Sequence, residues 1–87
     1  MRREAHAYIE TWEGIRGKAR LLLEALAKYE KAKVFSKDFI SENQLGTPSS
    51  TQRAVGILEE RGIIERQNGD YHVADVFLKA WLKQNIL

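Results

Sequence analysis

The sequence predicts a mostly α-helical domain that contains one short β-hairpin, and three observations lead to this α+β class. The stretch from Thr47 to Gly62 carries a complete helix signature, with a capping residue at each end. The pair Asn68-Gly69 separates two short runs of alternating residues, which is the strongest short hairpin signal. Helical spacing then returns after Asp75. Because a chain of 87 residues can bury only one core, we expect a single domain over residues 1–87.

Residues 1–35 are expected to form two N-terminal helices. The first has a short amphipathic pattern of four apolar residues: Ala5, Tyr8, Ile9 and Trp12. Gly14 and Gly17 interrupt this pattern and are expected to mark a bend. The pattern then resumes and predicts the first core helix, with six apolar residues on one side: Ile15, Ala19, Leu22, Leu23, Leu26 and Tyr29. The two glycines lack the spacing, the following hydroxyl and the preceding strand of a phosphate-binding loop, so no nucleotide site is expected.

Residues 36–62 are expected to form two helices joined by a tight turn. Ser36 can cap the first of them, and the turn from Leu45 to Pro48 ends it and starts the next. Phe39, Ile40 and Leu45 are available to the core. Two short helices separated by a glycine-containing turn, the second with a polar N-terminal half, are typical of a helix-turn-helix.

The second helix of this pair carries the most distinct end signals in the chain. Thr47 can cap it through its hydroxyl, Pro48 suits its first turn, and Gly62 supplies a left-handed stop. Four residues at helical spacing are expected to face the core: Thr51, Ala54, Val55 and Leu58. The opposite side is short and polar, so we interpret this helix as a recognition helix.

Residues 63–74 are expected to form a two-stranded wing, and residues 75–87 a closing helix. A two-residue turn sets four cross-strand pairs: Gln67 with Asp70, Arg66 with Tyr71, Glu65 with His72, and Ile64 with Val73. Of these, Ile64, Tyr71 and Val73 are expected to pack inward. Asp75 can cap the closing helix, whose apolar stripe is expected in the core: Phe77, Leu78, Trp81, Leu82 and Ile86.

Together these elements predict a winged helix-turn-helix with an N-terminal helical extension. The run from Pro48 to Glu65, continued by Tyr71, Asp75, Phe77, Trp81 and Leu82, resembles the C-terminal winged-helix domain of archaeal ATPases of the AAA+/STAND type. The resemblance covers roughly residues 36–87 and implies this fold. Val76 stands where such ATPases commonly have proline, and the chain contains no ATPase module, so the resemblance implies no ATPase activity here.

Several classes of function are not expected from this composition. The absence of cysteine excludes disulfides, thiolate catalysis and the common structural zinc sites. His6 and His72 are far apart in sequence, and the pair Glu65 and His72 has no nucleophile beside it, so we expect no metal, no cofactor, no small-molecule substrate and no enzymatic activity. No apolar run is long enough to cross a membrane, and a cytoplasmic location is expected.

Double-stranded DNA is the first candidate partner, for a transcriptional regulator or for the DNA-binding domain of an ATPase. Candidate contacts in the major groove are Ser49, Ser50, Gln52 and Arg53; candidate phosphate contacts are Thr47 and Lys37; candidate wing contacts are Arg66, Asn68 and Gly69. The net charge is +2, and residues 36–62 hold three Lys and Arg against four Asp and Glu. Because phosphate contacts rely on Lys and Arg, we expect modest affinity and a modest salt dependence.

A protein partner is the alternative, either a second copy of the chain or a fused or separate ATPase. Helical spacing directs Ile57 outward beside Arg53. Gly56 lies inside the same helix, where glycine is costly and sometimes marks close approach by another backbone. In a dimer, the basic N-terminal helices would be the expected contact between copies.

Overall fold

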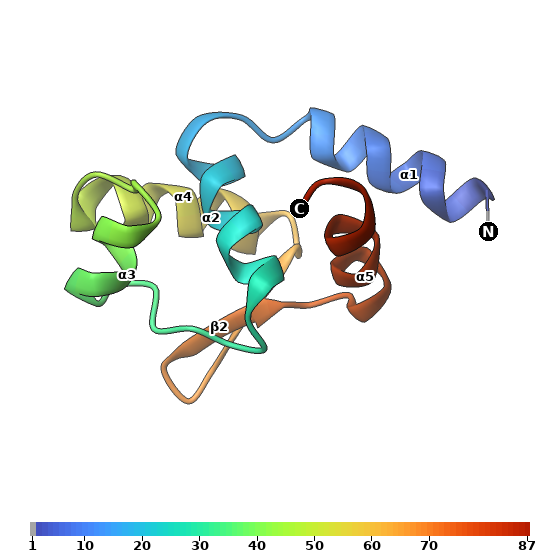
Figure 1. Cartoon of the computed structure of the whole chain (residues 1–87). Coiled ribbons are helices and arrows are strands. Elements are labelled where there is room, and N and C mark those ends of the chain that lie inside the picture. Colours follow the sequence, from blue (N-terminus) through green and yellow to red (C-terminus); the bar gives the residue numbers. More distant parts are fainter. Residues whose placement is uncertain (1) are drawn as a thin grey trace.

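The chain forms helices, a β-hairpin and a final helix, in the order that the sequence predicts (Figure 1). The computed structural model describes the backbone of residues 2–87 and the side chains from His6 onward. In this part the elements are α1 (Arg2–Glu13), α2 (Gly17–Lys28), α3 (Lys37–Glu42), α4 (Pro48–Glu60), β1 (Ile64–Gln67), β2 (Asp70–Val73) and α5 (Val76–Asn85). The predicted α+β class is confirmed. No helix in residues 2–87 combines the length and the apolar character needed to cross a bilayer.

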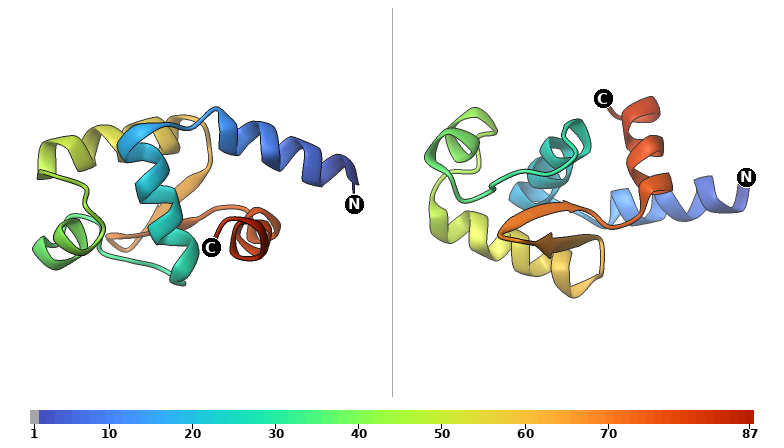
Figure 2. Two further views of the ribbon diagram at one scale, coloured as in Figure 1. Left: turned by 45° about the horizontal axis from the view of Figure 1, so that its top comes forward. Right: turned by 90° about the horizontal axis from the view of Figure 1, so that it is seen from below.

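The central element is α2, which contacts α4, α5 and β2 (Figure 2). Its buried residues cover much of its circumference: Ala19, Leu22, Leu23, Ala25, Leu26 and Ala27. A helix that is apolar on most of its sides is stable only when neighbours cover it, and the other elements do so here. The core therefore forms around α2 rather than around a sheet.

Parts of the predicted N-terminal pattern do not reach the core. Tyr29 follows the end of α2 in an extended conformation and is 43% exposed, because α2 already ends at Lys28. On α1, Trp12 is buried, whereas Ile9 is exposed. This helix packs against α5 and, near its C-terminal end, against Arg20 of α2, so only part of its apolar stripe is covered. The predicted Ala5 side chain lies outside the described side chains.

The bend between α1 and α2 lies where the two glycines predict it. Ile15 is buried in this connection, before α2 begins, rather than inside the helix. Gly17, the first residue of α2, has φ +61°, a conformation that glycine adopts without strain. The Arg20 side chain lies over the Trp12 ring at 4.3 Å and donates a hydrogen bond to the Trp12 carbonyl. These contacts hold the end of α1 against α2.

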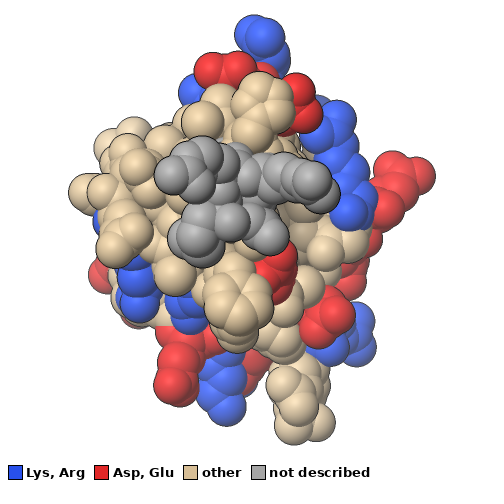
Figure 3. Space-filling model, turned by 90° about the vertical axis from the view of Figure 1, so that its right-hand side faces the viewer, with Lys and Arg blue, Asp and Glu red and all other residues tan. Residues whose placement is uncertain are grey.

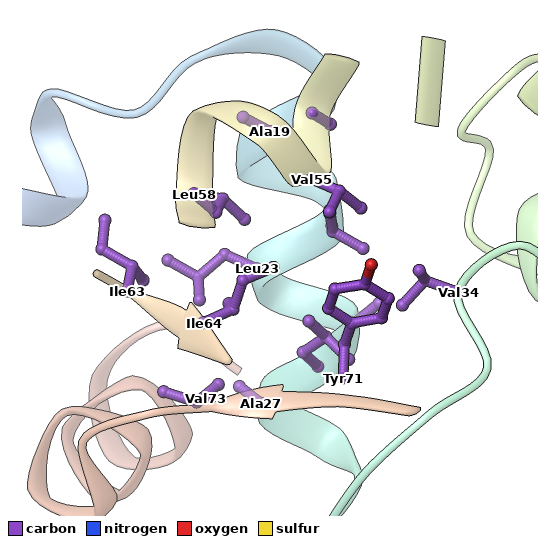
Figure 4. Close-up of a cluster of buried hydrophobic side chains, with 14 of the residues drawn as sticks. Ala19, Leu23, Ala27, Val34, Val55, Leu58, Ile63, Ile64, Tyr71 and Val73 are labelled. Carbon is purple, nitrogen blue, oxygen red and sulfur yellow. The ribbon is translucent and has the colours of Figure 1, made fainter. Parts of the chain in front are cut away.

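The hairpin has the register that the turn predicts. Ile64 pairs with Val73 and Gln67 with Asp70, and both turn residues have positive φ, 53° at Asn68 and 85° at Gly69. Such angles fit the twist of a two-residue turn between antiparallel strands. As predicted, three hairpin side chains point into the core: Ile64, Tyr71 and Val73 (Figure 4).

A third backbone segment extends the hairpin, which the sequence pattern did not reveal. Ala32 forms an isolated bridge with Tyr71, with both N–H···O distances at 2.9 Å. Beside this bridge, the Lys33 ammonium lies 3.0 Å from the Asp70 carboxylate. The segment between α2 and α3 is thereby attached to β2, and the Phe35 ring meets the Tyr71 ring edge-on at 6.1 Å between centroids.

The closing helix α5 is capped as predicted, but its apolar stripe is only partly buried. The Asp75 carboxylate accepts hydrogen bonds from the backbone N–H groups of Phe77 and Leu78. Leu78 and Leu82 are in the core, whereas Phe77 is 72% exposed, so its predicted burial is wrong. Trp81 packs against Tyr8 of α1, 6.1 Å between ring centroids. Phe77 lies one turn before Trp81, beyond this contact, and no described element covers it.

Candidate nucleic-acid interface

The start of α4 is held by a capping box. The Thr47 hydroxyl accepts from the Ser50 backbone N–H at 3.1 Å, and the Ser50 hydroxyl accepts from the Thr47 backbone N–H at 3.0 Å. The Ser50 hydroxyl is also close enough to donate to the carbonyl of buried Leu45. Because both hydroxyls are used within the chain, Thr47 and Ser50 fix the direction in which α4 leaves the turn.

The inner side of α4 is packed as the sequence predicts. Ala54, Val55 and Leu58 are buried, and Figure 4 shows the side chains of Val55 and Leu58 among those of the core around α2. Thr51 is fully buried, and its hydroxyl donates to the Thr47 carbonyl at 2.9 Å. The packing leaves one possible rotation of α4, which determines the residues that face outward.

The outer side of α4 presents polar side chains without intramolecular partners. Ser49, Gln52 and Arg53 are exposed, and in the described part of the chain their side chains form no hydrogen bond or ion pair. Gly56 is exposed on the same side, and Ile57 beside it is 41% exposed, as predicted. Unpaired polar groups on a rigid helix are free to bind a partner without first breaking a contact.

One cation lies at the turn before α4, and a second lies at the start of α3. The Lys18 ammonium, from the first turn of α2, donates to the Gln44 carbonyl at 2.9 Å and lies beside Gly46. It therefore projects over the turn that leads into α4. Lys37, the first residue of α3, is exposed and has no ion-pair partner among the described residues. Lys18 was not predicted as a site residue, because it is distant from α4 in sequence and only the tertiary fold brings it to the turn.

Negative charge lies at the opposite end of α4. Glu59 and Glu60 are both exposed in its last turn, while Arg61 donates to the Gly14 carbonyl at 3.4 Å. The N-terminal and C-terminal halves of α4 thus differ in charge. The face viewed in Figure 3, on the side of α1 and α5, mixes Lys and Arg with Asp and Glu and has no broad area of one sign.

The wing lies next to α4. Strand β1 follows α4 after a short turn and runs back beside it (Figure 2). Arg66 is exposed on β1, and Asn68 and Gly69 are exposed at the tip. The Asp70 carboxylate is occupied by Lys33, and the Glu65 carboxylate lies 3.4 Å from the His72 imidazole. Arg66 is consequently the cation on the hairpin that has no acidic partner among the described residues.

Comparisons with known proteins agree with this architecture. A family model described as "Probable winged helix domain" matches residues 6–84. No curated protein and no solved structure matched the chain. The match covers nearly all of the helices and the hairpin described above, including the helix-turn-helix pair and the wing. The chain therefore belongs to this winged helix domain family.

Proposed function

We propose that this winged helix domain binds double-stranded DNA, with α4 in the major groove. The observation that carries the proposal is the outer face of the N-terminal half of α4, where Ser49, Gln52 and Arg53 are exposed and unpaired. Their inner-side neighbours are buried, so the helix cannot rotate to bury them. Gln and Arg can each form two hydrogen bonds with the edge of one base, which is how major-groove sequence is read.

Lys18 and the remaining predicted residues have supporting roles in this proposal. Lys18 contacts a phosphate beside the turn, Lys37 contacts a phosphate from the start of α3, and Arg66 with the wing tip contacts the neighbouring backbone or minor groove. Thr47 and Ser50, whose hydroxyls form the capping box, orient α4 and leave base contacts to its exposed side chains.

Charge supports one orientation of α4 on DNA. The cation Lys18 lies near its beginning, whereas Glu59 and Glu60 lie at its end. Carboxylates close to phosphates are repelled, so the C-terminal half of α4 is expected to tilt away from the duplex. Recognition helices commonly read bases with their N-terminal residues, which fits this orientation.

Fluorescence anisotropy with a labelled random duplex at ~50 and ~200 mM salt tests the proposal. We expect binding that weakens between these conditions with the modest slope of a few phosphate contacts, and we expect Lys18→Ala to reduce the slope of log affinity against log salt by about 1. Arg53→Ala should weaken binding further. Lys83→Ala, which removes an exposed cation from α5, is the matched control and should have little effect. Absence of binding by the wild type at the lower salt would refute the proposal.

A protein partner is the second candidate function, and the exposure of Ile57 favours it. This β-branched side chain is 41% exposed on α4, beside Gly56 and near the acidic end of the helix. A second copy of the chain could cover it, or an ATPase could, as the resemblance to the winged-helix domain of archaeal ATPases implies. Light scattering of the wild type and Ile57→Glu tests self-association: a dimer that the substitution dissociates would support it, and monomers in both cases would count against it.

A further inference from the structure

The segment of residues 32–35, between α2 and α3, attaches β2 to the start of the helix-turn-helix. Ala32 exchanges two backbone hydrogen bonds with Tyr71, both at 2.9 Å. Val34 is fully buried, and Figure 4 shows its side chain pointing toward the Tyr71 ring. Ser36, the next residue after the segment, caps α3 through its hydroxyl. The wing and the helix-turn-helix are therefore joined by a short segment that is fastened to both.

An ion pair completes this attachment next to the wing tip. The Lys33 ammonium lies 3.0 Å from the Asp70 carboxylate, and the two side chains are 75% and 15% exposed, respectively. Among the described residues, no group other than Lys33 donates a hydrogen bond to this carboxylate. A mostly buried carboxylate without a partner is costly, so Asp70 depends on Lys33 to compensate its charge.

Asp70 lies where an uncompensated negative charge would oppose the proposed contacts of the wing. It directly follows Gly69 at the wing tip. Because adjacent Cα atoms are ~3.8 Å apart, a phosphate that contacts the tip would lie about 10 Å or less from this carboxylate, a distance comparable to the Debye length at ~0.1 M salt. Like charges at this separation repel each other. With Lys33 in place the pair is neutral, and Arg66 remains the hairpin cation without an acidic partner among the described residues.

We infer that Lys33 supports DNA binding indirectly, by neutralising the Asp70 carboxylate so that phosphates can approach the wing tip. The inference rests on the proposed DNA-binding function and adds to it a positioning residue that makes no contact with DNA itself. This role differs from those of Lys18 and Lys37, whose ammonium groups are proposed to contact phosphates directly. The affinity of the wing for DNA is then set by the charge of the Lys33–Asp70 pair as a whole.

Two single substitutions test the inference, because they break the same ion pair but change the charge beside the wing tip in opposite directions. Lys33→Met leaves the Asp70 carboxylate unpaired and should weaken binding to the random duplex about threefold to tenfold at ~50 mM salt. Asp70→Asn leaves the Lys33 ammonium unpaired and should strengthen binding by a similar factor. Both effects should shrink at ~200 mM salt, because screening weakens them. If the pair served only to hold the wing in place, both variants would bind more weakly.

The double variant, Lys33→Met with Asp70→Asn, separates charge neutralisation from a direct phosphate contact by Lys33. It restores a neutral pair and should bind within about twofold of the wild type. If Lys33 touched a phosphate, the double variant would remain as weak as Lys33→Met. Lys83→Met removes an exposed cation from α5 and is the matched control for net charge, with an expected change of less than about twofold. Circular dichroism verifies that each variant is folded at the temperature of the binding assay.

The outcomes separate this inference from the proposed function. It is supported if Asp70→Asn binds most tightly, the wild type and the double variant bind equally, and Lys33→Met binds most weakly. If both single variants bind more weakly than the wild type, or if neither differs from it, the inference is refuted while DNA binding stands. A double variant as weak as Lys33→Met also overturns it, since Lys33 then contacts DNA directly. If the wild type binds no duplex at ~50 mM salt, the proposed function fails and the inference fails with it.

Discussion

Ser49 and Ser50 are adjacent, chemically identical residues that the structure places in opposite roles. The Ser50 hydroxyl accepts from the Thr47 N–H and lies within donating distance of the Leu45 carbonyl, whereas the Ser49 hydroxyl has no partner among the described residues. Ser50→Ala therefore removes the acceptor for one backbone group and the donor for another at the start of α4. We expect a loss of about 1–2 kcal/mol in the free energy of unfolding.

Ser49→Ala should leave the free energy of unfolding within about 0.5 kcal/mol of the wild type, because the side chain is exposed and alanine favours the helix. Urea unfolding followed by circular dichroism measures the free energy of unfolding of both variants. For a domain of this size, the loss of roughly 1–2 kcal/mol in Ser50→Ala corresponds to a melting temperature lower by roughly 4–16 °C. DNA affinity, measured on folded protein, should show the opposite order. Ser49→Ala should weaken binding because it removes a contact with DNA, whereas folded Ser50→Ala should bind like the wild type. Equal stability of the two variants would show that the capping box does not hold α4.

Three further predictions concern the parts of the fold around the site. Phe77→Ala should change the free energy of unfolding by less than about 0.5 kcal/mol, whereas the neighbouring Leu78→Ala should cost about 2–5 kcal/mol; urea unfolding compares them, and a large effect at Phe77 would mean that something covers it. Gly69→Ala places a side chain at φ +85° and should cost about 1–2 kcal/mol in the same assay, while an unchanged stability would contradict the turn geometry. Burial, together with the nearby Lys83 charge, lowers the pKa of Lys79 in the folded chain. The unfolded chain therefore holds this proton more tightly, and the free energy of unfolding should rise as the pH increases through the folded-state pKa. In Lys79→Met, the free energy of unfolding from urea titrations should rise less between neutral and alkaline pH. An unaltered rise would contradict the lowered pKa of Lys79.

Local patterns predicted the elements whose causes are local. The turn Asn68-Gly69 set the register of the hairpin, since a two-residue turn allows one pairing. Thr47 and Gly62 marked the ends of α4, because a cap and a left-handed residue act on the adjacent backbone. The inner and outer sides of α4 followed from helical spacing alone. The fold class and the exposed polar face of the candidate site therefore follow from residues that are close together in the chain.

The tertiary structure decided the features that depend on distant segments. Phe77 and Leu78 are both apolar and both lie in α5, yet only the neighbours of α5 determine that one is buried and the other exposed. Ala32 joins β2, and Lys18 reaches the turn before α4, because the folded chain brings together segments that no sequence period connects. For Gly56, the sequence determines that it lies in a helix, and the tertiary structure determines that the space around it is open. Spacing along the chain determines which way a side chain points, and the packing of other elements determines what it meets there.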